Sequence, residues 1–133
     1  SSDLKMYVLI SCFLMSSLLK AQQVDNDTIV YQVVQVNPQF PGGALALNEY
    51  IEENIHYPAK AYEAKISGKV IVRILVEKNG SISQSKILLG LGYGCDEEVI
   101  RLISTFPKWI PGSQDGRLLR TYTQLVVKFT LKE

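Results

Sequence analysis

The feature that most constrains the fold is an Asn-Gly pair, Asn79-Gly80, between two segments with strand-like patterning. Within the first segment, Lys69–Glu77, every second residue is apolar: Val70, Val72, Ile74 and Val76. This two-residue period is typical of a strand with one buried face. Asn-Gly between two such segments is a strong signal for a tight, two-residue hairpin turn. The sequence therefore predicts two antiparallel strands, the second over Ser81–Leu89.

The apolar residues of the second segment change parity, from Ile82 to Ile87 and Leu89. Side chains alternate between the two faces of a strand, so a single register cannot bury all three residues on one face. An extra residue in the strand corrects the register. We therefore expect a β-bulge near Ser83–Ser85.

Helical periodicity precedes the hairpin. Residues 37–43 (NPQFPGG) are dense in proline and glycine and predict a turn. The apolar residues after this turn have the spacing of one helix face: Leu47, Tyr50, Ile51 and Ile55. Pro58 ends this helix, and because proline is favoured in a first helical turn, a second, short helix is predicted over residues 59–64.

A third helix is predicted after the glycine-rich run 90–94 (GLGYG). The acidic residues Asp96, Glu97 and Glu98 favour the positive end of a helix, and Pro107 ends it. The same acidic residues argue against a phosphate-binding loop in this run, because they would repel phosphate. The predicted buried stripe of the helix consists of Val99, Leu102, Ile103 and Phe106.

A last strand is predicted over Thr121–Leu131, where Leu125, Val127, Phe129 and Leu131 alternate with polar residues. The element order is then helix, helix, strand, strand, helix, strand. This order predicts an α+β domain in which a three-stranded antiparallel sheet has its helices packed on one face. Trp109, bracketed by Pro107 and Pro111, is predicted to fill the core.

The N-terminal part contains an uncharged apolar block of 14 residues, Met6–Leu19, between Lys5 and Lys20. A membrane-spanning helix needs about 20 apolar residues, whereas a block of this size is typical of a signal peptide. Residues 1–21 are therefore predicted to be a signal peptide cleaved after Ala21, and a buried helix of the fold is the alternative. Residues 22–37 then form a short tail or extended arm, and residues 38–133 the folded domain.

Charge and composition exclude several classes of function. The chain has 14 basic and 13 acidic residues, a net charge of +1, which gives no electrostatic footprint for nucleic acid. His56 is the only histidine, and after cleavage Cys95 is the only cysteine. These two residues cannot supply the three or four ligands of a usual metal site, and no nucleophile is placed beside His56. We expect no enzyme, no metal and no cofactor.

An ordered set of motifs resembles a known family. In chain order, the motifs are Phe40-Pro41-Gly42-Gly43, Tyr57-Pro58, Gly68-Lys69-Val70, Asn79-Gly80, Pro107-Lys108-Trp109, Pro111-Gly112 and Phe129-Thr130-Leu131. Together they resemble the C-terminal domain of TonB, the periplasmic energy transducer of Gram-negative outer-membrane import, over about residues 38–132. The resemblance implies a periplasmic module that binds the TonB box, an extended segment of an outer-membrane receptor, by adding it as a strand to a sheet edge.

The resemblance also suggests where the receptor segment would bind. His56, Tyr57 and Pro58 correspond to a receptor-contacting part of the family, although His56 replaces the glutamine of well-known members. The last strand is the candidate edge, because an exposed edge offers unpaired backbone groups to an extended peptide. Its candidate contact residues are Thr121, Thr123, Leu125, Val127 and Phe129.

A complete transducer also has an uncleaved anchor and a long proline-rich spacer. Residues 22–37 contain no proline and, fully extended, would span at most about 55 Å. We therefore expect a binding module rather than energy coupling to motor proteins of the ExbB and ExbD type. Three alternatives stay open: a transducer held at the inner membrane by an uncleaved Met6–Leu19, a homodimer formed through edge strands, and a domain attached to peptidoglycan.

Overall fold

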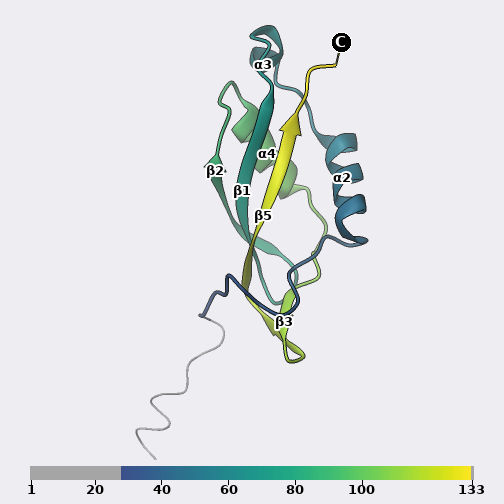
Figure 1. The fold of residues 1–133 in the computed structure, drawn as a ribbon, viewed down its shortest axis with the longest axis vertical. Coiled ribbons are helices and arrows are strands. Elements are labelled where there is room, and N and C mark those ends of the chain that lie inside the picture. Colours follow the sequence, from purple (N-terminus) through teal and green to yellow (C-terminus); the bar gives the residue numbers. More distant parts are fainter. Residues whose placement is uncertain (1–27, 133) are drawn as a thin grey trace, which may run out of the picture.

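The computed structural model describes residues 28–132. The predicted signal peptide and residues 22–27 of the predicted tail lie outside this range. Figure 1 shows the helices and strands, which are α2 (Gly43–Asn54), α3 (Ala59–Glu63), β1 (Gly68–Val76), β2 (Ile82–Leu89), α4 (Cys95–Ser104), β3 (Gly112–Gln114), β4 (Arg117–Leu119) and β5 (Thr121–Phe129). No helix within these residues is long and apolar enough to cross a membrane.

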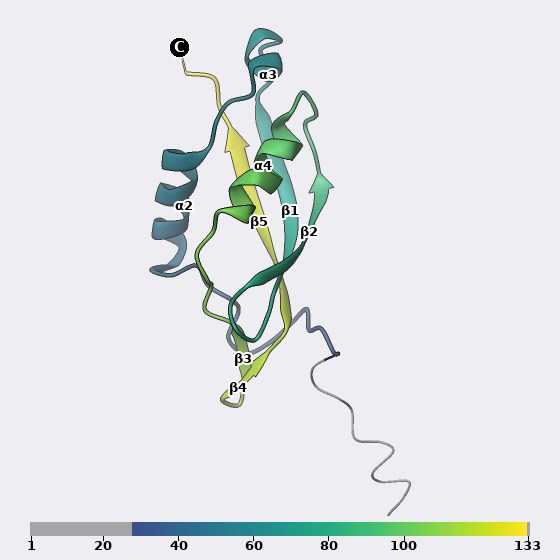
Figure 2. The same ribbon diagram turned by 180° about the vertical axis from the view of Figure 1, so that it is seen from behind.

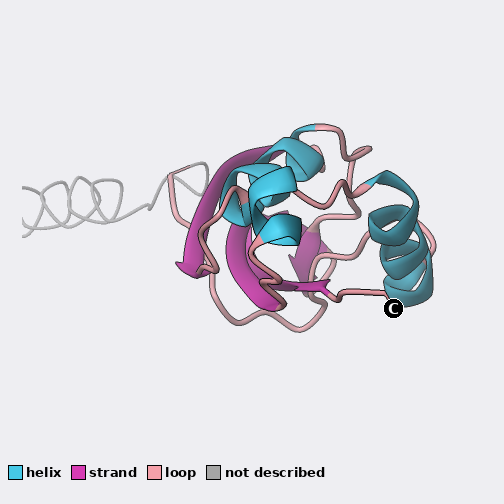
Figure 3. Ribbon diagram, turned by 90° about the horizontal axis from the view of Figure 1, so that it is seen from above, coloured by secondary structure: helices cyan, strands magenta, loops and turns pink. Residues whose placement is uncertain are grey.

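The main sheet has three antiparallel strands in the order β2-β1-β5. The helices cover one of its faces, as the view along the sheet shows (Figure 3). This arrangement confirms the predicted α+β fold. The order is not the chain order, because β5 returns after α4 to pair with β1 on the side opposite β2, which makes β1 the central strand (Figure 2).

The core lies between the sheet and the helices. The even-numbered residues of β1, from Val70 to Val76, are fully buried, as are Val99 and Leu102 of α4. Leu125, Val127 and Phe129 of β5 belong to the same apolar cluster. Burying an aliphatic side chain of this size stabilises the fold by about 1.5–3 kcal/mol, so these alternating residues are what holds the three strands against α4.

The β1–β2 turn is tight but is not the predicted two-residue turn. The N–H of Gly80 donates to the carbonyl of Glu77 (2.9 Å), and Gly80 has a φ of +85°. Asn79 does not adopt a positive φ, which a two-residue Asn-Gly turn would require at both positions. The loop is therefore a turn of three residues that ends in a left-handed glycine.

A second, small hairpin was not anticipated from the sequence. β3 and β4 pair through Gln114 and Arg117, so two residues, Asp115 and Gly116, form the loop. Both have positive φ, +51° and +76°. This is the two-residue turn that Asp-Gly favours. The Asp115-Gly116 dipeptide is therefore the feature of the sequence that indicates this hairpin.

Strand β2 contains two irregularities. Leu75 pairs with Gln84 and Val76 with Ile82, so Ser83 is an extra residue. This confirms the predicted bulge. A second, unpredicted bulge leaves Leu88 unpaired between Ile87 and Leu89. Strand β5, in contrast, pairs with β1 at nine consecutive positions.

Trp109 belongs to an aromatic cluster at the lower end of α2 and α4. It is 5% exposed, and its ring lies 5.8 Å from that of Phe40 and 5.9 Å from that of Phe106. This confirms that Trp109 is a core residue. Its backbone also fixes the β1–β2 turn, because its N–H donates to the carbonyl of Gly80 (2.8 Å).

Residues 28–37 form an extended arm without a strand of their own, held to the domain by isolated backbone pairs. Val36 exchanges two hydrogen bonds with Ser113 of β3, at 3.0 and 2.9 Å. The amide of Gln35 bonds Asp115 twice, through its Nε2 (3.2 Å) and its Oε1 (2.9 Å). Tyr31 pairs in parallel fashion with the start of β5. The arm thus crosses the lower end of the sheet (Figure 1).

Candidate functional site

The outer side of β5 is a sheet edge, and the hydrogen bonds of the arm show which of its residues face outward. The carbonyl of Arg120 accepts from the N–H of Tyr31 (2.8 Å), and the N–H of Tyr122 donates to the carbonyl of Tyr31 (2.9 Å). Backbone groups alternate in direction along a strand, so the even-numbered residues point away from β1. Among the described residues, no backbone group is bonded to the outward N–H and C=O groups of Gln124, Val126 and Lys128. We call these groups the free edge.

A groove of about 830 Å³ runs beside the free edge, between β5 and α2. Figures 1 and 3 show α2 alongside β5 with its axis set apart from the sheet. The helical wall of the groove is lined by Asn48, Ile51, Glu52, Ile55, Tyr57 and Tyr62. Val126, Lys128 and the residues from Phe129 to Lys132 line the opposite wall. The groove is therefore a mixed polar and apolar channel next to unpaired backbone.

The residues that sequence reasoning assigned to this strand have another orientation. Thr121, Leu125, Val127 and Phe129 have buried side chains, and Thr123 is half-buried. All five are odd-numbered, so their backbone groups point toward β1. The strand was anticipated, but the outward residues Gln124, Val126 and Lys128 were not named. The alternation of apolar residues over Thr121–Leu131 contained that signal. The buried side chains are odd-numbered, so the exposed residues of this strand are the even-numbered ones.

The segment His56-Tyr57-Pro58 joins α2 to α3 at the upper end of the groove. The ring of Tyr57 stands edge-on to Phe129 of β5, with centroids 5.7 Å apart, and its hydroxyl donates to the carbonyl of Ile66. Burial raises the pKa of Tyr57, and the nearby thiol of Cys95 adds to the effect. The structure brings Tyr57 to the groove, whereas His56 is exposed and Pro58 caps α3.

Glu98 of α4 fixes this segment. Its carboxylate accepts from the backbone N–H of His56 (2.6 Å) and from Nε of Arg101 (2.5 Å). Arg101 also donates to the carbonyl of Asn54 at the end of α2 (2.9 Å). Burial raises the pKa of Glu98, but the hydrogen bonds from Arg101 and His56 outweigh it and leave the pKa below its usual value. The acidic start of α4 therefore holds the end of α2 and the entry to α3 in place.

The described part of the chain offers no metal site, and its one cysteine is buried. No group of three or more His, Cys, Asp or Glu residues within residues 28–132 could hold a metal ion. Cys95 is fully buried at the start of α4, and burial, aided by Asp96 and Glu97, raises the pKa of its thiol. A buried thiol that stays protonated is a poor nucleophile.

The geometry is that of a small α+β domain whose regular edge strand, β5, lies beside a groove. The family model described as "Gram-negative bacterial TonB protein C-terminal" matches residues 53–131, more than half of the chain. The chain therefore belongs to the TonB C-terminal family. No curated protein and no solved structure matches the chain.

Membership makes this domain a TonB-like, transport-associated module of a family that is not enzymatic. The matched range begins within α2 and ends after β5, so it includes the free edge and most of the groove. It includes neither Phe40-Pro41-Gly42-Gly43, which is one motif of the sequence resemblance, nor the arm. The boundary of the domain at residue 38 stays a prediction.

Proposed function

We propose that this domain binds an extended segment of an outer-membrane receptor, the TonB box, as an added strand on β5. The observation that carries the proposal is the free edge: three successive outward residues, Gln124, Val126 and Lys128, whose backbone groups have no backbone partner among residues 28–132. Unpaired N–H and C=O groups in a regular strand are a template for an extended peptide. We also propose that the module acts in the periplasm, delivered there by the signal peptide at residues 1–21.

The groove supports the same proposal, because it gives an added strand somewhere to place its side chains. Alternate side chains of a strand point to opposite faces, so every second side chain of the peptide would enter the groove. There it would meet Ile51, Ile55 and Tyr57. Backbone hydrogen bonds would supply affinity, and the shape of the groove would supply selectivity.

The arm limits the length of strand that can be added. Tyr31 already occupies the edge at Arg120 and Tyr122, so the peptide would begin at the following position. From there to the end of β5 about 20–25 Å of edge is available at about 3.3 Å per residue. A receptor segment of about six or seven residues would fill this length.

The proposal is tested by amide hydrogen exchange with a synthetic TonB-box peptide. The outward amides of Gln124, Val126 and Lys128 face solvent in the free protein and should slow at least tenfold when the peptide binds. The inward amides of Thr123, Leu125 and Val127 are already bonded to β1 and should change little. Unchanged exchange along β5 at millimolar peptide, or protection of β2 instead, contradicts the proposal.

A proline variant tests directly whether the peptide uses the outward N–H groups of β5. Val126→Pro removes one outward N–H, and a proline is tolerated on an edge strand when its N–H would face away from the ladder. The variant should keep its fold and lose about tenfold or more in peptide affinity. Equal affinity in the folded variant would show that the peptide does not use this edge.

A further inference from the structure

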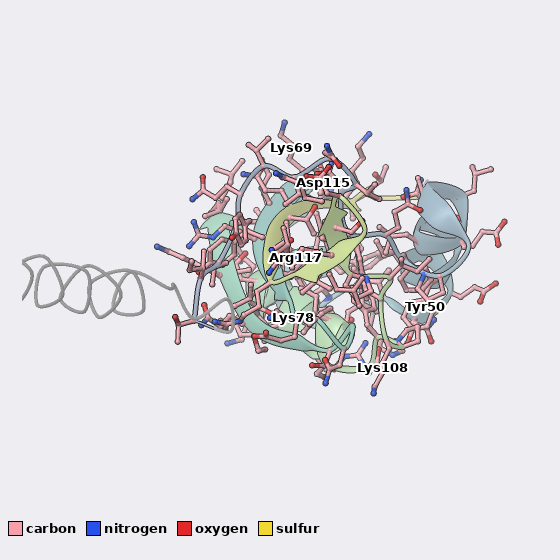
Figure 4. All side chains as sticks on the ribbon, turned by 90° about the horizontal axis from the view of Figure 1, so that it is seen from below. Tyr50, Lys69, Lys78, Lys108, Asp115 and Arg117 are labelled. Carbon is pink, nitrogen blue, oxygen red and sulfur yellow. The ribbon has the colours of Figure 1, made fainter. Side chains whose placement is uncertain are left out.

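Among residues 28–132, no other segment covers the upper half of the sheet face opposite the helices. On this face the strands place their side chains in rows that the register defines: Lys69 with Lys128, then Ile71 with Val126 and Leu89, then Arg73 with Gln124 and Lys86. We call these eight residues the bare face. Figure 4 shows Lys69 projecting from the side of the molecule opposite Lys108, which lies on the helical side.

The lower half of the same face is covered. Leu75 and Tyr122 form the next row, and Leu75 is fully buried there. A cavity of about 350 Å³ between the arm and the sheet is lined by Gln32 and Asn37 of the arm together with Arg73 and Tyr122. The arm therefore covers this end and reaches the row of Arg73 and Gln124, which also line the cavity. It does not reach the apolar row, where Val126 is 49% exposed and Leu89 46% exposed.

The charges of the bare face oppose the pairing of its own strands. Lys69 lies directly opposite Lys128, and Arg73 directly opposite Lys86. Like charges directly opposite each other on antiparallel strands are destabilising. Within the described residues, none of these four cations forms an ion pair, and the three rows contain no carboxylate. The guanidinium of Arg73 lies over the ring of Tyr122, 4.3 Å from its centroid, and the three lysines have no such contact among these residues. A local conflict of this kind, retained in an otherwise consistent fold, is expected at a functional surface.

The geometry points to a second docking surface, which binds an amphipathic helix of a partner protein whose apolar stripe has acidic residues on both sides. This inference uses side chains of the open face, whereas strand addition uses the backbone edge. Val126 and Lys128 border both surfaces, so Ile71, Leu89 and Lys86, which do not line the groove, separate the two sites. The apolar row of Val126, Ile71 and Leu89 would receive the stripe, and the two cationic rows would pair with the flanking carboxylates.

The dimensions of the bare face fit one helix. The apolar row crosses three strands, about 10 Å at a strand spacing of about 4.8 Å, which equals two helical turns of about 5.4 Å each. The cationic rows lie four residues apart along β1, about 13 Å. A helix with side chains is about 10–12 Å wide. A helix lying across the strands on the apolar row would therefore have a row of cations along each side.

Charge complementarity separates this occupant from two others. A second copy would bring four cations against four cations, and the resulting repulsion disfavours a symmetric dimer through this face. An anionic membrane would satisfy the cations, but the apolar residues lie flat within a sheet and do not project into a bilayer as an amphipathic helix does. An acidic helix satisfies both the charges and the apolar row.

The test uses the full chain and two synthetic helical peptides. One peptide carries leucine at positions i, i+3 and i+7 with glutamate on both sides of this stripe, and the other has lysine in place of every glutamate. The acidic peptide should bind saturably and shift the methyl NMR signals of Ile71 and Leu89, which do not line the groove; Val126 borders both surfaces and should shift with them. The basic peptide should bind at least tenfold more weakly.

Charge-reversal variants locate the site. Lys69→Glu with Lys86→Glu reverses one cation in each row without touching β5 and should weaken the acidic peptide at least tenfold. The reversal also replaces two like-charge pairs by attractive ones, so thermal stability should rise by about 1–4 °C. The matched control, Lys108→Glu on the helical side, should leave peptide affinity unchanged.

Each other outcome overturns the inference. Equal binding by the double variant and wild type, or methyl shifts confined to the groove, would place the peptide elsewhere. Failure of the acidic peptide to bind at millimolar concentration would exclude this class of partner. If the acidic peptide does not bind, but phosphatidylglycerol vesicles bind wild type and bind the double variant more weakly, the face would be assigned to lipid. A dimer in sedimentation that the double variant abolishes would assign it to a second copy.

Discussion

The two edges of the sheet differ in regularity, and the difference indicates which one can accept another strand. β5 pairs with β1 at nine consecutive positions, whereas β2 pairs at six with bulges at Ser83 and Leu88. Bulges twist a strand and interrupt its outward row of backbone groups, which is a common protection of sheet edges. Both edges belong to one small sheet, but β5 alone presents a regular template.

The physical origin of the difference lies in the side chains. β5 alternates strictly between buried and exposed residues from Gln124 to Phe129, so one register satisfies the whole strand. β2 begins with Ile82 on the core side and continues with Ile87 on the same face, which an uninterrupted register cannot achieve. The bulge at Ser83 reconciles the two, and the β2 edge loses its regularity as a result.

The largest expected effect comes from disrupting the contact between Gly80, in the β1–β2 turn, and the backbone of Trp109. A Cβ at Gly80 would lie 2.1 Å from the carbonyl oxygen of Trp109, at a φ of +85°. Gly80→Ala should therefore destabilise the fold by about 4 kcal/mol through combined overpacking and backbone strain. Urea denaturation measures the loss. Gly116→Ala, with a φ of +76° and no atom within 4 Å of the added Cβ, is the matched control and should cost about 1 kcal/mol. Equal losses of stability in the two variants would show that the close approach of Trp109 to Gly80 is not the cause.

The second-largest effect tests which residues of β5 direct their backbone groups toward β1. Val127 bonds β1 with its backbone, so Val127→Pro removes a hydrogen bond of the ladder and should cost about 3 kcal/mol or more. Val126→Pro, one residue away, removes an outward N–H and should cost clearly less. Denaturation midpoints of the two variants compare them directly. A larger loss for Val126→Pro would reverse the assignment of inward and outward residues.

A pH-dependent effect concerns Glu77, which ties the two edges together. Its carboxylate accepts from Arg120, before β5, at 2.7 and 2.9 Å and from Ser83 at the β2 bulge (2.6 Å). The hydrogen bond from Arg120 is the main cause that lowers the pKa of Glu77, and burial opposes it. Because the pKa is lower in the folded state, the stabilisation is present above the ordinary glutamate pKa and is lost as pH falls through the folded value.

Glu77→Gln should cost about 1–2 kcal/mol at pH 7. The difference from wild type should shrink as pH falls below about 4.5 toward the lowered pKa. Thermal unfolding between pH 7 and pH 3 measures both quantities. Glu53→Gln on the exposed side of α2 is the control and should change stability by less than about 0.5 kcal/mol. A constant difference at all pH values would contradict the ion pair as the cause.

The smallest expected effect lengthens the free edge. Tyr31→Pro removes the N–H that donates to Arg120 (2.8 Å) and should cost about 0.5–1.5 kcal/mol. The amide of Tyr122 should then exchange faster, because its acceptor is the carbonyl of the same arm residue. Val33→Pro is the control, since Val33 is 84% exposed. Unchanged exchange of Tyr122 in the Tyr31 variant would show that the arm does not guard this end of the edge.

The candidate site could be predicted in part. The alternating residues of Thr121–Leu131 indicate β5, and the motif set by itself indicates the family. The same alternation shows which side chains are buried, but the identity of the free backbone groups needs the position of β1. Tyr57 could be assigned to the groove only through the resemblance. Its neighbour Phe129 is distant in sequence, and its bond to Ile66 follows no helix or strand period.

The sequence by itself determined the local elements: the periods of two and about 3.6, the breakers at prolines and glycines, and the parity change that required the bulge at Ser83. These follow from short-range sterics and from which side chains avoid water. Tertiary structure decided the rest. Strand order made β5 an edge, the arm occupied one end of that edge, and the register placed Lys69 against Lys128. These contacts join residues 45 to 90 positions apart in the chain. Local sequence does not encode such pairings, because they depend on how all elements bury their apolar faces together.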